Sequence, residues 1–226
     1  MRQVVLLLTM VALVAAGCAG GDDDSATEEP PAATTPTGEA PAATAPPAGT
    51  TQAPATKEGR IFTRSELPRL ALQPSDAPKG MRYTKAESGR KTLFEVGVAL
   101  NTQIRELRGM GFRAVYDAIF DSTSAQSDLR LATRTWLFQR PSGAERWLER
   151  TRGNSFAVAL APVQSPPLAD GSWAARGNVG GSDIISHAFR AGNVVVLVTF
   201  STQRVRLSEA DALAAARRAV TRVQRA

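Results

Sequence analysis

The chain has 226 residues, of which 43% are hydrophobic, 21% charged and 6% aromatic. This composition supports one globular core and excludes fibrous and collagen-like classes. The single Cys excludes an intramolecular disulfide framework, and the single His excludes paired-imidazole metal sites such as H-E-x-x-H. The net charge of +6 is unevenly distributed: residues 19–56 hold six acidic and no basic side chains, whereas residues 57–226 hold 26 basic and 15 acidic ones.

The first 17 residues have the pattern of an export signal. Arg2 supplies one positive charge, and residues 4–16 form an uncharged, largely apolar run. This run is shorter than the roughly 20 apolar residues that a membrane-spanning helix needs. A short apolar region followed by small residues is typical of a signal peptide, which we therefore predict over residues 1–17.

The segment Val14-Ala15-Ala16-Gly17-Cys18 places small residues immediately before the only cysteine. It resembles the lipobox of bacterial lipoproteins. The resemblance implies that the sulfur of Cys18 receives a diacylglyceryl group and that cleavage makes Cys18 the amino terminus. Two or three such acyl chains (palmitate, for example) hold a protein on a membrane almost permanently. We therefore expect attachment to the cell membrane on its extracytoplasmic face. The alternative is an unmodified cysteine that ends a secretory signal or an uncleaved membrane anchor.

Residues 18–60 read as a tether. From position 19 they contain no aromatic residue and no Leu, Ile or Val, and they are rich in Ala, Pro and Thr. Such a stretch cannot bury enough apolar surface to offset its conformational entropy, so we expect it to be disordered. A flexible coil of this length has a root-mean-square reach of about 35–40 Å. The Asp22-Asp23-Asp24 run lacks an ordered cage, so we expect no calcium site there.

Residues 61–226 are predicted to form a single domain. Thr63 and Glu66 have the spacing of a capping box, which predicts a short helix that ends before Pro74. A turn over 75–80 and a strand over 82–86 are expected next. A longer amphipathic helix follows over 93–107, because its apolar residues recur at spacings of three and four: Leu93, Val96, Leu100, Ile104 and Leu107.

The second half of the domain alternates between strand and helix patterns. Period-two alternation predicts strands over 112–120 and 131–139, and Pro141-Ser142-Gly143 starts a helix. Two apolar runs, 184–189 and 194–200, flank the turn residues 190–193 and predict a hairpin. Ser208 opens a last helix that ends in Arg217, Arg218, Arg222 and Arg225. The whole predicts an α+β domain with a mainly antiparallel sheet of about five to six strands packed by helices.

Residues that carry catalytic chemistry are few. His187 follows Ser186 in a predicted strand, where neighbours point to opposite faces, so they do not form a nucleophile–base pair. We expect His187 to face solvent or to be hydrogen-bonded in a strand. Asp117 and Asp121 invite comparison with a glycosidase pair, but solvated strand residues are the interpretation we favour. No catalytic, cofactor-binding or metal-binding residue is therefore predicted, and we expect no enzymatic activity.

Three further features have ordinary structural explanations. Trp136, Trp147 and Trp173 are expected in or beside the core, with a ligand groove as the alternative. The glycines of 109–111 and 177–181 lack the lysine of a phosphate-binding loop and are expected in turns. The basic balance of the domain favours anionic partners in the envelope, such as phospholipid headgroups or acidic polymers, and not nucleic acid. Of the 26 basic residues 22 are Arg and four are Lys, and the explanation we favour for this preponderance is a GC-rich genome that favours Arg codons.

Short motifs carry a family resemblance: Leu67-Pro68, Asp76-x-Pro78-x-Gly80, Gly111-Phe112, Ser142-Gly143-Ala144, Gly171-Ser172 and Phe189-Arg190-x-Gly192-Asn193. They resemble a broad group of actinobacterial envelope lipoproteins. They are similar to sensor-type extracytoplasmic domains such as that of the mycobacterial kinase PknH and, more loosely, to PsbP-like lipoproteins. The resemblance implies an α+β domain with an antiparallel sheet and a cleft for an apolar or amphipathic ligand.

We therefore expect a membrane-anchored lipoprotein whose domain binds an envelope ligand as a non-catalytic sensor or accessory factor. One alternative is a lipid or glycolipid carrier with an apolar cleft between the sheet and the helix over 93–107. Another is an envelope hydrolase whose catalytic groups are not recognisable in the sequence. A deep apolar pocket favours the carrier, whereas a flat basic face favours a binder of anionic polymers.

Overall fold

A computed structural model describes residues 60–226, except 97–100 and 158–159. The predicted signal peptide, Cys18, the Asp22-Asp23-Asp24 run and the tether up to residue 59 lie outside the described residues. The elements, in chain order, are α1 (Leu67–Leu70), a 3₁₀ turn η1 (Pro74–Asp76), β1 (Met81–Tyr83), β2 (Gly89–Lys91), α2 (Asn101–Gly109), β3 (Phe112–Ser122), β4 (Arg130–Phe138), α3 (Pro141–Ala157), β5 (Ala161–Pro162), β6 (Asp170–Val179), β7 (Ser182–Ala191), β8 (Val194–Thr202) and α4 (Glu209–Arg225).

The strands form one antiparallel sheet in the order β1-β3-β4-β8-β7-β6-β5, and β2 also pairs with β3. The α+β prediction is confirmed, with eight strands in place of five to six. The sequence patterns missed β2, β5 and β6, of which β2 and β5 have only three and two residues. Segments this short carry too few residues to show a period of two.

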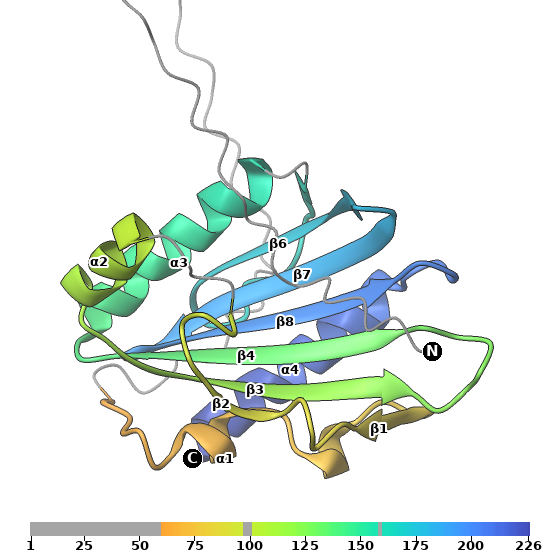
Figure 1. Ribbon diagram of the computed structural model, residues 1–226, viewed down its shortest axis with the longest axis horizontal. Helices are drawn as coiled ribbons and strands as arrows, with labels where there is room; N and C mark the ends of the chain where they lie inside the picture. The colour runs from red at the N-terminus through yellow and green to blue at the C-terminus, as the bar shows by residue number, and fades with distance from the viewer. Residues whose placement is uncertain (1–59, 97–100, 158–159) are drawn as a thin grey trace, which may run out of the picture. The chain divides into compact units, whose positions relative to one another are not determined.

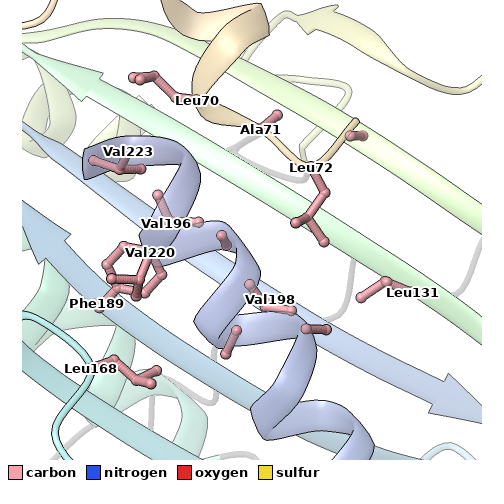
Figure 2. Close-up of a cluster of buried hydrophobic side chains, with 14 of the residues drawn as sticks. Leu70, Ala71, Leu72, Leu131, Leu168, Phe189, Val196, Val198, Val220 and Val223 are labelled. Carbon is pink, nitrogen blue, oxygen red and sulfur yellow. The ribbon is translucent and has the colours of Figure 1, made fainter. Parts of the chain in front are cut away.

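Helix α4 covers one face of the sheet and contacts β7 and β8 (Figure 1). Its buried side consists largely of alanines, which let the helix axis approach the strands closely. Aliphatic and aromatic side chains of α1, β4, β7 and β8 surround it, as Figure 2 shows for Leu70, Leu131, Phe189 and Val196. The helix starts as predicted, because the Ser208 hydroxyl accepts the N–H of Asp211 at 3.2 Å.

Helices α2 and α3 lie on the opposite face (Figure 1). Beneath them is a second apolar cluster that contains the three tryptophans. Trp136 and Trp147 lie with ring centroids 4.8 Å apart, and Phe138 lies 6.4 Å from Trp147. Helix α3 starts at Pro141, as the sequence predicts.

The β7–β8 hairpin is confirmed, and it holds the first described residues in place. The buried side chain of Asn193 accepts the N–H of Phe62 at 2.7 Å and donates to the carbonyls of Phe62 (3.0 Å) and Phe138 (2.7 Å). Gly192 has φ +55°, and a Cβ there would lie 2.0 Å from the carbonyl oxygen of Arg60. The turn therefore needs glycine, and the domain begins against this turn.

Two predicted helix starts are corrected. The Glu66 carboxylate accepts the backbone N–H of Thr63, but the Thr63 hydroxyl also donates to Glu66, so only half of the capping box forms and α1 has four residues. The helix predicted over 93–107 is described only from Asn101, and Leu100 lies outside the described residues. Before the undescribed residues, Thr92 and Glu95 form a capping box at a turn over 93–96.

The alternation predicted for 112–120 holds from Ala114 onward. A bulge between Phe112 and Ala114 shifts the register. Phe112 therefore joins the cluster under α2 and α3, 5.8 Å from the ring of Trp136, whereas Ala114 faces α4.

Candidate functional site

A basic surface is formed by two segments that lie far apart in the sequence, residues 60–91 and residues 217–226. Helix α1 packs against α4, and β1 and β2 line the adjacent edge strand β3. Figure 1 shows α1, β2 and the C-terminus at this edge. The contacts include Arg222 to the Asp76 carboxylate at 2.7 Å, Arg218 to the Asp76 carbonyl at 3.0 Å, and Arg60 to the Ala226 carbonyl.

Charge is concentrated on this basic surface. Its two segments contain twelve Lys and Arg but only three Asp and Glu, whereas residues 92–216 contain thirteen basic and eleven acidic side chains. The excess positive charge of the domain is therefore polarised. Its basic members are Arg60, Arg64, Arg69, Lys79, Arg82, Lys85, Arg90, Lys91, Arg217, Arg218, Arg222 and Arg225.

The three acids of the basic surface are occupied by structural contacts. Asp76 pairs with Arg222, Glu66 pairs with Arg60 at 3.1 Å, and Glu87 pairs with Arg130. Hydrogen bonds from the hydroxyl and the backbone N–H of Thr63 lower the pKa of Glu66, and Arg60 adds to the effect.

Most of the basic groups have no such partner. Four arginines in and just before α1 and in α4 have exposed side chains and no carboxylate partner among the described residues: Arg64, Arg69, Arg217 and Arg225. Guanidinium groups match phosphate and carboxylate oxygens in a bidentate geometry, so free arginines on a surface suit an anionic ligand. The excess of basic residues in each segment is evident from the sequence, but that the two segments lie together depends on the packing of α1 on α4.

The aspartates considered as a glycosidase pair are each engaged with an arginine of β4. Asp117 is 4% exposed and accepts from Arg134 at two atoms, 2.9 and 2.8 Å. Asp121 accepts the hydroxyl of Thr84 at 2.6 Å and lies 3.7 Å from Arg130. The expectation that Asp117 is solvated is wrong, because antiparallel pairing sets it directly opposite Arg134. Both carboxylates act as partners of arginine in this structure.

His187 and Ser186 point to opposite faces of β7, as predicted. Ser186 contacts the hydroxyl of Thr199 at 3.1 Å on the face of α2 and α3. His187 lies on the α4 face, flanked across the strands by Ala174 and Val198. It is 3% exposed and its Nδ1 has no hydrogen-bond partner, so the expectation of a solvent-facing or hydrogen-bonded side chain is wrong. Burial lowers the pKa of His187, opposed by the charge of Glu209.

The tryptophans belong to the core, as expected. Trp136, Trp147 and Trp173 are 4%, 9% and 8% exposed. A hollow of about 180 Å³ lies beside Trp173, lined by Arg152, Pro162, Val163, Ser165, Leu168, Ser172, Trp173 and Ala174. Sites for small molecules are usually about 300–1,000 Å³, so this hollow is small for a lipid.

The glycines expected in turns are placed as follows. Gly180 and Gly181, with φ +58° and +81°, form the two-residue turn between β6 and β7, which is a type that requires positive φ. Gly111, φ +77°, connects α2 to β3. Gly177 lies inside β6 instead of in a turn. Over residues 60–96, 101–157 and 160–226, no group of three or more His, Cys, Asp and Glu is placed to hold a metal ion.

No protein-family model and no curated protein matches the chain. The chain is similar to the extracellular domain of PknH from Mycobacterium tuberculosis, with 15% identity and a TM-score of 0.49, over 72% of this chain and 98% of that one. Among the described helices, none is long and apolar enough to span a membrane.

Proposed function

We propose that the protein is a membrane-anchored lipoprotein whose extracytoplasmic domain binds an anionic envelope ligand without catalysis. Cys18 would hold it on the membrane, residues 18–60 would form the tether, and residues 61–226 the binding domain. The observation that carries the proposal is that two segments packed against each other, residues 60–91 and 217–226, contain twelve basic and only three acidic residues. Sensor and accessory roles both follow from binding of this kind, because either requires recognition of a ligand but no chemistry.

The anchor is tested by metabolic labelling. Radiolabelled palmitate is expected in the wild-type protein and not in a Cys18→Ser variant, which should move from the membrane fraction to the soluble fraction. A labelled Cys18→Ser variant, or unchanged membrane fractionation, would contradict the anchor.

Ligand binding is tested with soluble polyphosphate as the probe. Two triple variants have the same net charge but remove arginines from different places. The first replaces Arg64, Arg69 and Arg225 of the basic surface with Gln. The second replaces three exposed arginines of α2 and the turn before α3: Arg105, Arg108 and Arg140.

Only the first triple variant is expected to weaken polyphosphate binding, by roughly tenfold or more, because its arginines lie in the two segments with a large excess of basic residues, whereas residues 92–216 are nearly balanced in charge. Equal affinities for the two variants would contradict a localised site. Native mass spectrometry of the protein from its own host tests the carrier alternative, which requires a co-purified lipid.

A further inference from the structure

We infer that the basic surface docks directly on an anionic phospholipid membrane, the one to which Cys18 would be attached. This inference rests on the proposed function and names its ligand. It also fixes an orientation, because the domain would lie with α1 and the end of α4 against the lipid headgroups.

The place where the chain enters the domain supports this occupant. Arg60, the first described residue, contacts the carbonyl of Ala226 and the carboxylate of Glu66, so the tether joins the domain at the basic surface. The flexible coil predicted from sequence for residues 18–60 would have a root-mean-square reach of about 35–40 Å. Electrostatic attraction in physiological salt extends only about 8 Å. A surface at the exit of the tether is therefore the one that meets the membrane most often.

An exposed aliphatic residue lies at the same place. Ile61 is 52% exposed between Arg60 and Phe62, whose backbone is held by Asn193, so its side chain stays on the surface. Anionic lipid surfaces bind basic groups electrostatically and apolar side chains at the boundary between headgroups and acyl chains. A soluble polyanion offers no apolar layer, so Ile61 favours a membrane over a polymer.

The tether itself is the other anionic candidate. Its six acids lie at positions 22–39, beside Cys18 and remote from Arg60 in sequence. These acids would be repelled by an anionic membrane while the basic surface is attracted to it. Binding of the basic surface to the tether would not depend on the charge of the lipid. The lipid charge therefore distinguishes docking on the membrane from binding to the tether.

The experiment uses the full lipidated chain reconstituted in vesicles. A donor fluorophore is placed on Ser65→Cys, between Arg64 and the α1 helix, and an acceptor is carried by the lipid headgroups; acylated Cys18 does not react with the label. Energy transfer is expected to be high in vesicles containing phosphatidylglycerol and low in pure phosphatidylcholine, and to fall in 0.5 M salt. A donor on Gly153→Cys of α3, where an added Cβ meets no atom within 4 Å, should show little dependence on lipid charge.

The two triple variants supply the control. Each basic residue near an anionic membrane contributes roughly fivefold to binding, so the Arg64, Arg69 and Arg225 variant should dock about 100-fold less well. The Arg105, Arg108 and Arg140 variant should keep the wild-type transfer. The inference would be overturned if energy transfer from the Ser65→Cys donor did not depend on lipid charge, or if it fell equally in both triple variants. Polyphosphate binding without docking would overturn it and leave the proposed function standing, whereas absence of the protein from floated vesicles would refute the anchor and the inference together.

Discussion

The side chain of Asn193 is predicted to be the most important single polar group for the position of the first domain residues. Asn193→Ala removes three hydrogen bonds, two to the backbone of Phe62 and one to the carbonyl of Phe138. A buried polar group left without a partner costs about 1–3 kcal/mol. Three groups lose their partner, but separation of residues 60–62 from the hairpin would return some of them to water. We therefore expect the free energy of unfolding to fall by about 3 kcal/mol.

Urea unfolding of a soluble form, residues 19–226 without Cys18, measures this loss through tryptophan fluorescence. A loss of about 3 kcal/mol lowers the midpoint by roughly 1–2 M, given typical urea dependences. Asn178→Ala is the matched control, because its exposed side chain accepts one hydrogen bond, from the N–H of Gly181 at 3.2 Å. The control should lose no more than about 1 kcal/mol. Equal losses in the two variants would refute the role assigned to Asn193.

Three other substitutions have defined outcomes in the same unfolding assay. Asp117→Asn leaves the largely buried guanidinium of Arg134 without its charged partner and should lower the free energy of unfolding by about 3–5 kcal/mol. Asp121→Asn, at a more exposed ion pair, should lower it by under about 1 kcal/mol. Similar losses in the two variants would contradict the argument from burial. Gly143→Ala places a Cβ 2.0 Å from the carbonyl oxygen of Met110 and should destabilise by about 1–3 kcal/mol; a variant as stable as wild type would contradict this contact. Since the pKa of His187 is lowered from 6.5, the wild type should lose stability as pH falls below 6.5, and His187→Gln should lack this part of the slope; parallel pH profiles would contradict it.

The parts of the fold predicted from sequence are those encoded locally. The apolar runs on both sides of Gly192 predict the β7–β8 hairpin, and Ser208 predicts the start of α4, because turn and cap residues act within a few positions. The bulge at Phe112 interrupted the predicted alternation. It depends on the pairing of β3 with β4 and on packing in the cluster under α2 and α3, which a local period does not contain.

The candidate site depends on contacts between distant segments. Arg217 and Arg225 were visible as basic residues at the end of a helix. The sequence did not show that α1, which carries Arg69, packs against that helix, or that Arg90 of β2 donates to the carbonyl of Arg64. The pairing of Asp117 with Arg134 could have been predicted from the sequence, since the hairpin register of β3 and β4 places the two residues opposite each other. The burial of His187 could not have been predicted, because it depends on where α4 crosses β7.

The salt dependence of polyphosphate binding tests the central claim most directly, because its slope counts the cations displaced by basic groups. On a single-stranded polyanion, each neutralised phosphate contributes about 0.7 to the slope of log K against log salt. The variant lacking Arg64, Arg69 and Arg225 should therefore have a slope shallower by about two, while the variant lacking Arg105, Arg108 and Arg140 keeps the wild-type slope. Identical slopes in the two variants would show that the edge formed by α1 and α4 is not where anions bind.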